Sequence, residues 1–372
     1  MRRENTVLYN KQTRIVGIGN GGTNAVNCMI SAGLQGVQFI TINTDSNSLA
    51  KSNAPLRIQI GKDVTQGTGT GGKPAVARKA ANEARQVIQE VLLGADVLFI
   101  TAGLGGGTGS GAAPVVASIA KELGIPSIAV VTRPFRFEGS KQTRIAKEAI
   151  KELEEYVDYL IVFPNGRLSG VSSEQTTLKE SFCIVDNLIC QGVQVINEFI
   201  RLPGLINVDL ANLKAIMANQ CATLITVGRA EGVDRARVAA EQALVCPLLG
   251  LSIHNARGIL INITASTSLD LEETQTITNI LKGATHPTTE YALGIAIDET
   301  MGDAIRITVI ASGFRNEIWD VWANHGKRRP KKQAVLTIPT EAGSNGSRLG
   351  SGKKGVFGFS LRNIPIPGFL SR

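Results

Sequence analysis

A glycine-rich stretch at residues 103–111, GLGGGTGSG, is the part of the sequence best suited to bind a charged ligand. It follows an apolar run typical of a strand, residues 97–102, and precedes a run typical of a helix, residues 112–123. Because glycine has no Cβ, consecutive backbone N–H groups can turn toward one point, and the start of a helix adds partial positive charge there. The pattern predicts a polyphosphate site rather than a plain surface loop, with Pro114 in the first turn of the helix.

A second glycine turn follows the first predicted strand, residues 14–19. Gly17, Gly19 and Gly22 match the G-x-G-x-x-G fingerprint of dinucleotide-binding proteins, and the next predicted strand ends in an acid, Asp45. Alone, this match would indicate a Rossmann oxidoreductase that binds NAD. That hypothesis leaves the richer loop at residues 103–111 unexplained, so we favour two loops that converge on one phosphate chain.

A third glycine cluster, QGTGTGGKP at residues 66–74, is too long and too rich in glycine for a tight turn. Two interpretations stay open at this point. The cluster is either a mobile loop that orders around a terminal phosphate or a plain surface loop.

The net charge of +8 is concentrated at one end of the chain. Residues 313–372 hold 11 of the 39 basic residues and 3 of the 31 acidic ones, so the preceding part is neutral. This distribution places any polyanion binding in the tail, and we do not expect nucleic acid as a partner. The five cysteines show no CxxC spacing, which argues against a zinc site and for reduced thiols. No run reaches the ~18 apolar residues of a membrane span, and we expect a cytoplasmic protein.

Apolar strand-like runs alternate with amphipathic helical runs up to about residue 165. This alternation predicts a parallel sheet with helices on both faces and a binding site at the carboxyl ends of its strands. A long apolar helix over residues 178–199 follows, then a helix at 205–213. Four further strand-like runs with helices between them predict a smaller domain with a mixed sheet, at residues 223–228, 258–264, 291–298 and 305–312.

Several motifs in order resemble the FtsZ branch of the tubulin and FtsZ superfamily. The loop GGGTGSG at residues 105–111 is similar to the family's signature, and the resemblance covers roughly residues 13–313 and the extreme C-terminus. The supporting motifs are GIGNGGTNAV, NTD at 43–45, GTGTGGKP, RPFRFEG at 133–139, PNGR at 164–167 and PGLINVD at 203–209. The resemblance implies a GTP-dependent, filament-forming protein of the bacterial division ring.

The resemblance also implies a nucleotide site with GTP and Mg²⁺. Glycine N–H groups would bind the phosphates, Glu138 would reach the ribose, and Asn24, Asn165, Phe182 and Asp186 would hold or stack on guanine. An aspartate that accepts from the base selects G over A, because the wrong base would leave polar groups unpaired. The full set is Gly19, Asn20, Gly21, Gly22, Asn24, Asp45, Gly71, Gly72, Gly105, Gly106, Gly107, Thr108, Gly109, Thr132, Glu138, Gln142, Asn165, Phe182 and Asp186.

In this family the residues that orient the attacking water come from the next subunit, and Asn207, Asp209 and Asn212 match that loop. Asn212 stands where the family usually has an acid, and an amide cannot take a proton from water as a carboxylate does. Gln142 stands where the family has an arginine. These departures support an alternative, a drifted copolymer that binds GTP with little hydrolysis.

The predicted fold class is α/β, with a Rossmann-like GTPase domain, a long central helix, a smaller C-terminal α/β domain and a flexible tail. The boundaries we expect are 1–12, 13–177, 178–203, 204–313, a basic linker at 314–361 and a docking peptide at 362–372. The C-terminal IPIPGFL is similar to the family's docking peptide, which implies membrane tethers and regulators as partners and indirect membrane association at the division site. The residues concerned are Ile364, Pro365, Pro367, Phe369 and Leu370. The head-to-tail homopolymer is the other implied partner.

Overall fold

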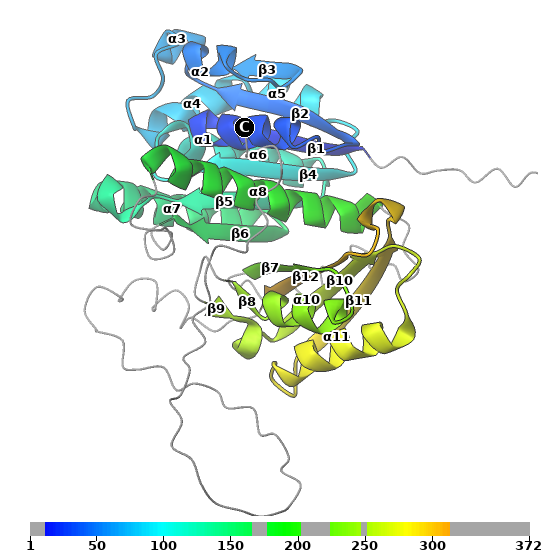
Figure 1. Ribbon diagram of the computed structural model, residues 1–372. Helices are drawn as coiled ribbons and strands as arrows, with labels where there is room; N and C mark the ends of the chain where they lie inside the picture. The colour runs from blue at the N-terminus through cyan, green and yellow to red at the C-terminus, as the bar shows by residue number, and fades with distance from the viewer. Residues whose placement is uncertain (1–11, 166–176, 202–223, 247–250, 313–372) are drawn as a thin grey trace, which may run out of the picture. The chain divides into compact units, whose positions relative to one another are not determined.

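The computed structural model describes residues 12–165, 177–201, 224–246 and 251–312. These residues form a six-stranded parallel sheet and a four-stranded mixed sheet, together with a short two-stranded pair (Figure 1). The predicted helix at 205–213 lies outside the described residues. The predicted α/β fold class is confirmed.

The first sheet has the strand order β3-β2-β1-β4-β5-β6. Its strands are β1 (Thr13–Ile18), β2 (Val37–Asn43), β3 (Leu56–Gln59), β4 (Val97–Gly103), β5 (Ser127–Arg133) and β6 (Tyr159–Pro164). All neighbours are parallel, and β1 pairs with β4 so that Ile18 stands beside Ala102. The turns that follow β1 and β4 therefore leave the sheet side by side at its carboxyl edge.

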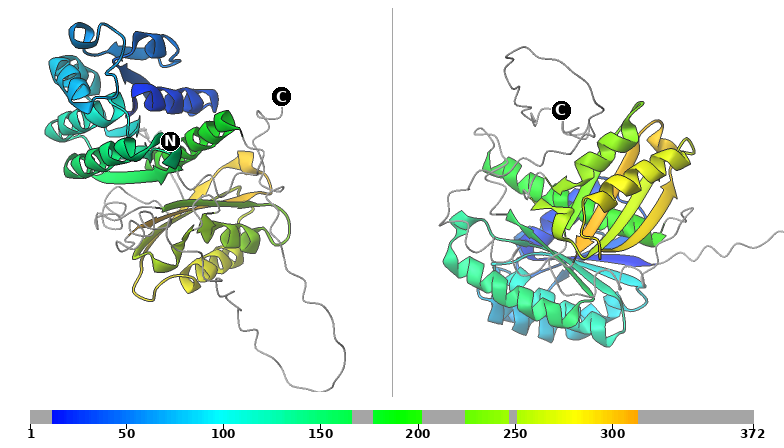
Figure 2. Two further views of the ribbon diagram at one scale, coloured as in Figure 1. Left: turned by 90° about the vertical axis from the view of Figure 1, so that its left-hand side faces the viewer. Right: turned by 90° about the horizontal axis from the view of Figure 1, so that it is seen from below.

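Helices cover both faces of this sheet, as Figures 1 and 2 show. One face packs against α1 (Gly19–Ser31) and α8 (Leu178–Arg201). The other face packs against α4 (Pro74–Glu83), α5 (Arg85–Leu92), α6 (Thr108–Glu122) and α7 (Ser140–Tyr156). Two short helices lie near the carboxyl edge, α2 (Ser46–Ala50) and α3 (Lys62–Thr65).

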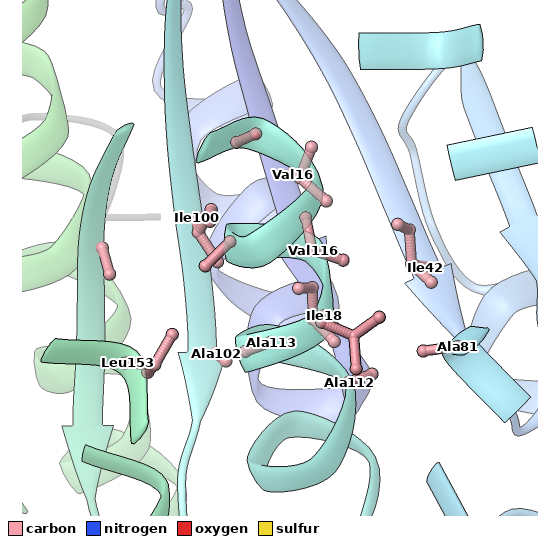
Figure 3. Close-up of a cluster of buried hydrophobic side chains, with 14 of the residues drawn as sticks. Val16, Ile18, Ile42, Ala81, Ile100, Ala102, Ala112, Ala113, Val116 and Leu153 are labelled. Atoms are coloured by element: carbon pink, nitrogen blue, oxygen red, sulfur yellow. The ribbon is translucent and has the colours of Figure 1, made fainter. Parts of the chain in front are cut away.

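The two-sided covering explains the continuous apolar runs in the sequence. In β1 the side chain of Ile15 belongs to the core beneath α1 and α8, whereas Val16 and Ile18 belong to the core on the opposite face. Figure 3 shows that second core, where Ile100 of β4 and Val116 of α6 lie among the same side chains. A strand buried on both faces has no polar positions to alternate with apolar ones.

The second sheet has the order β11-β10-β12-β7. Its strands are β7 (Leu224–Ala230), β10 (Gly258–Ala265), β11 (Glu290–Ile297) and β12 (Ile305–Ser312), with α10 (Arg235–Ala243) and α11 (Leu271–Gly283) packed on it. β10 pairs in parallel with β11, and the other two pairings are antiparallel, so the predicted mixed sheet is confirmed. The two-stranded pair is β8 (Val245–Cys246) with β9 (Leu251–Ser252).

Three local features differ from the sequence expectations. α6 begins at Thr108, inside the glycine loop, so Pro114 lies within the helix and not in its first turn. Residues 75–92, one of the helical runs between predicted strands, form two helices and not one, separated at Ala84, whose φ of −91° and ψ of 11° are not helical. The short elements α2, β3 and α3 carry too few apolar residues to stand out in the sequence. Within the described part of the chain, no helix has the length and apolar character needed to span a membrane.

Candidate functional site

The turns after β1 and β4 are in close contact at the carboxyl edge of the first sheet. A Cβ at Gly19, whose φ is +70°, would lie 3.1 Å from the amide N of Gly109. A Cβ at Gly21 would lie 3.0 Å from the Cα of Gly103. Both turns therefore need glycine where they meet, and the predicted convergence of two glycine loops is what the structure shows.

The glycines of the G-x-G-x-x-G pattern have a related role in packing. A Cβ at Gly22 would lie 2.5 Å from the carbonyl oxygen of Thr101, and one at Gly17 would overlap the carbonyl oxygen of Gly22. These positions let α1 start directly against β1 and β4. α1 consequently begins at Gly19, with its N-terminal N–H groups at the carboxyl edge of the sheet.

The turn after β4 is packed on most sides and open at one residue. The N–H of Gly105 donates to Ser110 Oγ at 2.9 Å, and a Cβ at Gly109 would overlap the carbonyl oxygen of Gly103. A Cβ at Gly107 would overlap the Thr70 hydroxyl. Gly106, by contrast, is exposed and has open space at its Cβ position. The start of α6 thus presents an unfilled surface beside a helix N-terminus, which suits an anion.

Two buried residues at the end of β2, Asn43 within the strand and Thr44 directly after it, hold both turns in place. Asn43 Nδ2 donates to Asn20 Oδ1 at 2.9 Å, and the hydroxyls of Thr44 and Thr108 are 2.8 Å apart. Asn43 and Thr44 are fully buried. Neither residue is among the site residues predicted from the sequence, although both belong to the NTD motif at 43–45. Their hydrogen bonds fix Asn20 and Thr108 relative to the sheet.

Asp45 ends the same motif and caps a helix. Its Oδ1 accepts from the N–H of Asn47 at 2.9 Å and of Ser48 at 3.3 Å. The backbone of Asp45 also forms an isolated bridge with Thr68, in the third glycine cluster. Asp45 therefore connects the β2 end to residues 66–74 rather than standing free in the site.

The third glycine cluster is attached at its start and open further along. The N–H of Ser46 donates to the carbonyl of Gly67 at 3.0 Å, and Thr70 is buried against Gly107. Gly71 and Gly72 are exposed, have φ values of +58° and +73°, and have open space at their Cβ positions. The cluster thus extends from the two glycine turns into solvent, as either of the two interpretations given above requires.

The ends of β5 and β6 bring the next group of predicted residues to the same edge. Thr132 is buried, and its carbonyl accepts from Leu104 N–H at 2.9 Å. Gln142, at the start of α7, lies beside the turn after β4. A Cβ at Gly105 in that turn would be 3.1 Å from the carbonyl oxygen of Gln142. Glu138 Oε1 accepts from the N–H of Phe135 at 2.8 Å, so one carboxylate oxygen is engaged by the backbone.

Asn165 brings a buried hydrogen-bond acceptor to the same edge of the sheet. It follows β6, is 5% exposed, and its Oδ1 has no hydrogen-bond partner among the described residues. A buried acceptor without a partner costs about 1–3 kcal/mol. A donor from a bound molecule would remove that cost.

α8 contributes an aromatic ring and a carboxyl group. Phe182 is 43% exposed, and its ring contacts the ring of Phe135. Asp186 is half-buried one turn later, and burial raises the pKa of its carboxyl group to about 7. Its charge acts on Cys28 of α1, and Asn24 is exposed one turn before Cys28. Asp186 of α8 is therefore near Cys28 of α1, with Asn24 one turn earlier on α1 and Phe182 one turn earlier on α8.

These features together fit a nucleoside triphosphate. The paired glycine turns present N–H groups of the kind that bind phosphates. The buried Asn165 oxygen, the exposed Phe182 ring and the Asp186 carboxyl have the chemistry to bind a base by hydrogen bonds and stacking. Among the described residues there is no group of three or more His, Cys, Asp or Glu side chains able to hold a metal ion. Asn207, Asp209 and Asn212 lie outside the described residues, as do the five residues of the docking peptide.

Comparison with known proteins agrees with this geometry. Residues 12–173 match the model of the tubulin/FtsZ family GTPase domain, and residues 221–315 match that of the FtsZ family C-terminal domain. The chain therefore carries a GTPase domain, which favours this interpretation over the NAD-binding oxidoreductase.

Solved structures of FtsZ from M. jannaschii are similar over most of their length. A tryptophan-to-tyrosine variant is 35% identical, with a TM-score of 0.74, over 82% of this chain and 92% of its own. An FtsZ dimer described as empty is 34% identical, with a TM-score of 0.74, over 89% of this chain and 95% of its own.

A more distant structure shares the fold. CetZ1 from Haloferax volcanii, solved as a GDP-bound monomer, is 19% identical, with a TM-score of 0.71, over 85% of this chain and 100% of its own. With two family models matched in order and FtsZ structures similar over most of the sequence, the chain belongs to the tubulin/FtsZ family.

Proposed function

We propose that this chain is a self-assembling GTPase of the cell-division ring that binds GTP at the carboxyl edge of its first sheet. The observation that carries the proposal is the contact between Gly19 and Gly109, which brings two helix N-termini to one point beside the open surface at Gly106. A triphosphate is the ligand that such a pair of N-termini fits best.

Different residues around the N-termini of α1 and α6 would bind different parts of the nucleotide. N–H groups of Gly19–Gly22 and Gly105–Gly109 would hold the phosphates, with Gly71 and Gly72 bordering the terminal one. Glu138 has one carboxylate oxygen engaged by Phe135, and its other oxygen would bind the ribose. Asn165, Phe182 and Asp186 would bind guanine. An ionised Asp186 accepts from the amino group and ring N–H of guanine, and adenine offers no matching donors.

Mg²⁺ would accompany the nucleotide and neutralise charge on the phosphates. Because the described residues contain no cluster of acidic ligands, we expect phosphate oxygens and water to supply most of its coordination. Phosphoryl transfer to water depends mainly on positioning and charge stabilisation. The water-orienting groups in our proposal are Asn207, Asp209 and Asn212 of the next subunit, so hydrolysis requires a head-to-tail filament.

Relatives described as dimer and protofilament support assembly. The second M. jannaschii FtsZ structure is a dimer, and CetZ2 from Haloferax volcanii was solved as a GTPγS-bound protofilament. We extend this to the domain boundaries and the tail: a GTP-binding domain to residue 177, a central helix to 203, an assembly domain to 313, and a docking peptide at 362–372. That peptide would bind membrane tethers and regulators, placing a cytoplasmic filament at the division site.

The test is GTP hydrolysis measured against protein concentration, with sedimentation of the same samples. Turnover per subunit that rises steeply as pellets appear would support a site completed between subunits. Turnover that is independent of concentration would contradict it. The absence of both pellets and turnover would overturn the proposal as a whole.

The second candidate function is a GTP-binding copolymer with little hydrolysis. Its support is Gln142, whose backbone lies beside the turn after β4 and which carries an amide in place of the family's arginine, together with the amide of Asn212 in the assembly loop. Pellets without phosphate release would favour it. Asn212→Asp should then raise turnover severalfold at unchanged GTP affinity, since a carboxylate accepts the proton that an amide cannot. Unchanged turnover in that variant would contradict the role we give to Asn212.

A further inference from the structure

Two cysteines face each other where α1 packs on α8. Cys28 is half-buried and its Sγ donates to Asn187 Oδ1 at 3.2 Å. Cys190 is 4% exposed and lies three residues after Asn187, on the same side of α8. Both cysteines belong to the packing of one core, Cys190 as a buried member from α8 and Cys28 as a half-buried side chain from α1.

The two thiols differ in access and acidity. The hydrogen bond with Cys190 lowers the pKa of Cys28, although burial and the nearby Asp186 carboxyl act in the opposite direction. The same hydrogen bond and burial raise the pKa of Cys190. Cys28 is therefore the thiol that ionises first, and it is the more exposed of the two.

We propose that Cys28 and Cys190 form a reversible disulfide that joins α1 to α8, made by exchange with a low-molecular-weight disulfide such as glutathione disulfide. The Cys28 thiolate attacks one glutathione sulfur, forms a mixed disulfide and releases the first glutathione thiolate. Cys190 loses its proton to water and attacks the Cys28 sulfur, which releases the second glutathione. Two protein thiols are oxidised and one glutathione disulfide is reduced to two thiols, so atoms and electrons balance.

The cross-link would connect two parts of the candidate nucleotide site. α1 begins at Gly19, and α8 carries Phe182 and Asp186. It would also close a loop of more than 150 residues, which constrains the unfolded chain strongly. Any effect on GTP affinity rests on the proposed function, whereas formation of the disulfide does not.

The experiment uses the full chain with Cys183→Ser. Cys183 is exposed and would react with glutathione by itself, and no Lys or Arg separates it from Cys190, so tryptic digestion would leave both on one peptide. The protein is incubated with increasing ratios of oxidised to reduced glutathione, quenched by alkylation, digested and analysed by mass spectrometry. We expect a peptide pair joined through Cys28 and Cys190, lost on addition of dithiothreitol, and a higher thermal midpoint for the oxidised protein.

Two variants complete the test. Cys190→Ser should stop at the mixed disulfide on Cys28, and Cys28→Ser should leave Cys190 unmodified. A stable mixed disulfide on Cys28 in the Cys183→Ser protein, or pairing of Cys28 with Cys221 or Cys246, would overturn the proposal.

If a variant does not fold, alkylation rates in the parent protein serve instead: Cys28 must react faster than Cys190, and equal rates contradict the assignment. GTP binding measured on both redox forms separates this proposal from the function, since the disulfide can form in a chain that binds no GTP.

Discussion

The ring of Phe182 meets the ring of Phe135 edge to face, with centroids 5.1 Å apart and planes at 82°. Phe135 is 4% exposed and its N–H is held by Glu138, so it is the fixed member of the pair. Phe137 stacks on Phe135 as well, at 5.1 Å and 15°, and is 66% exposed. Phe135 therefore positions the ring that we propose to stack on guanine.

Phe135→Leu should weaken GTP binding while keeping the core filled. An edge-to-face pair contributes about 0.5–1.5 kcal/mol, which corresponds to roughly a 2- to 13-fold loss of affinity. Fluorescent GTP-analogue titration measures this, and inorganic tripolyphosphate, which has no base, should compete as well as it does in the parent protein. Phe137→Leu is the matched control, since it leaves the Phe135–Phe182 contact in place. Equal weakening of both ligands by Phe135→Leu would show a general structural effect instead.

Asp186 should make GTP binding depend on pH. Burial raises the pKa of this carboxyl group from 3.8 to about 7, and guanine requires the ionised form. Affinity should therefore rise between pH 6 and 8, and Asp186→Asn should be weaker and lose the dependence. Tripolyphosphate competition over the same pH range corrects for protonation of the phosphates. If GTP affinity depends on pH in the same way in the parent protein and in Asp186→Asn, the role of Asp186 is contradicted.

The same shift predicts the stability of the free protein. Because the folded pKa is higher than the unfolded one, the folded chain holds a proton that the unfolded chain releases, so this group's contribution to stability falls from pH 3.8 to about 7. Asp186→Asn should raise the free energy of unfolding at pH 8 by about 1–3 kcal/mol. Chemical denaturation without nucleotide at pH 5 and pH 8 measures the difference, which should be less than half as large at the lower pH. A variant less stable than the parent protein at pH 8 would contradict this prediction.

The sequence predicts this fold well where local signals agree with the tertiary structure. The apolar run of β12 is bounded correctly at Ile305 and Ser312, because a buried strand has few polar interruptions. The sequence predicts the start of α6 four residues late, at 112 and not at Thr108, since glycine has low helix propensity and only contact with the β1 turn explains a helix there.

The candidate site, like the fold, is predicted from the sequence only in part. Glycine turns are visible in the sequence because each glycine meets a local backbone requirement. The link from Asn43 to Asn20 and the meeting of Cys28 with Cys190 join residues that are distant in sequence. Neither follows from periodicity or spacing, so both required the structure.

Arg235 should be important for the stability of the second sheet. Its side chain is 7% exposed and binds Glu273 through two bonds, of 2.6 Å and 2.9 Å, and Asp303 at 2.9 Å. Arg235→Ala would leave the partly buried Glu273 unpaired, at a cost of about 3–5 kcal/mol. Arg237 is the matched control, because it pairs with Asp234 and Glu241 at the surface and its loss should change little. Thermal unfolding of both variants makes the comparison, and equal midpoints would contradict the prediction.

Alanine substitutions at Gly106 and Gly109 should affect ligand binding and folding differently. A Cβ at Gly109 would overlap the carbonyl oxygen of Gly103, whereas one at Gly106 would meet open space. Gly109→Ala should therefore cost about 1–3 kcal/mol of stability, and Gly106→Ala should cost little. Because the open space at Gly106 is where we place the phosphates, Gly106→Ala should still weaken GTP binding severalfold. Thermal unfolding without nucleotide, followed by GTP titration, distinguishes the two effects. If Gly106→Ala binds GTP as tightly as the parent protein, the phosphates do not bind at that surface.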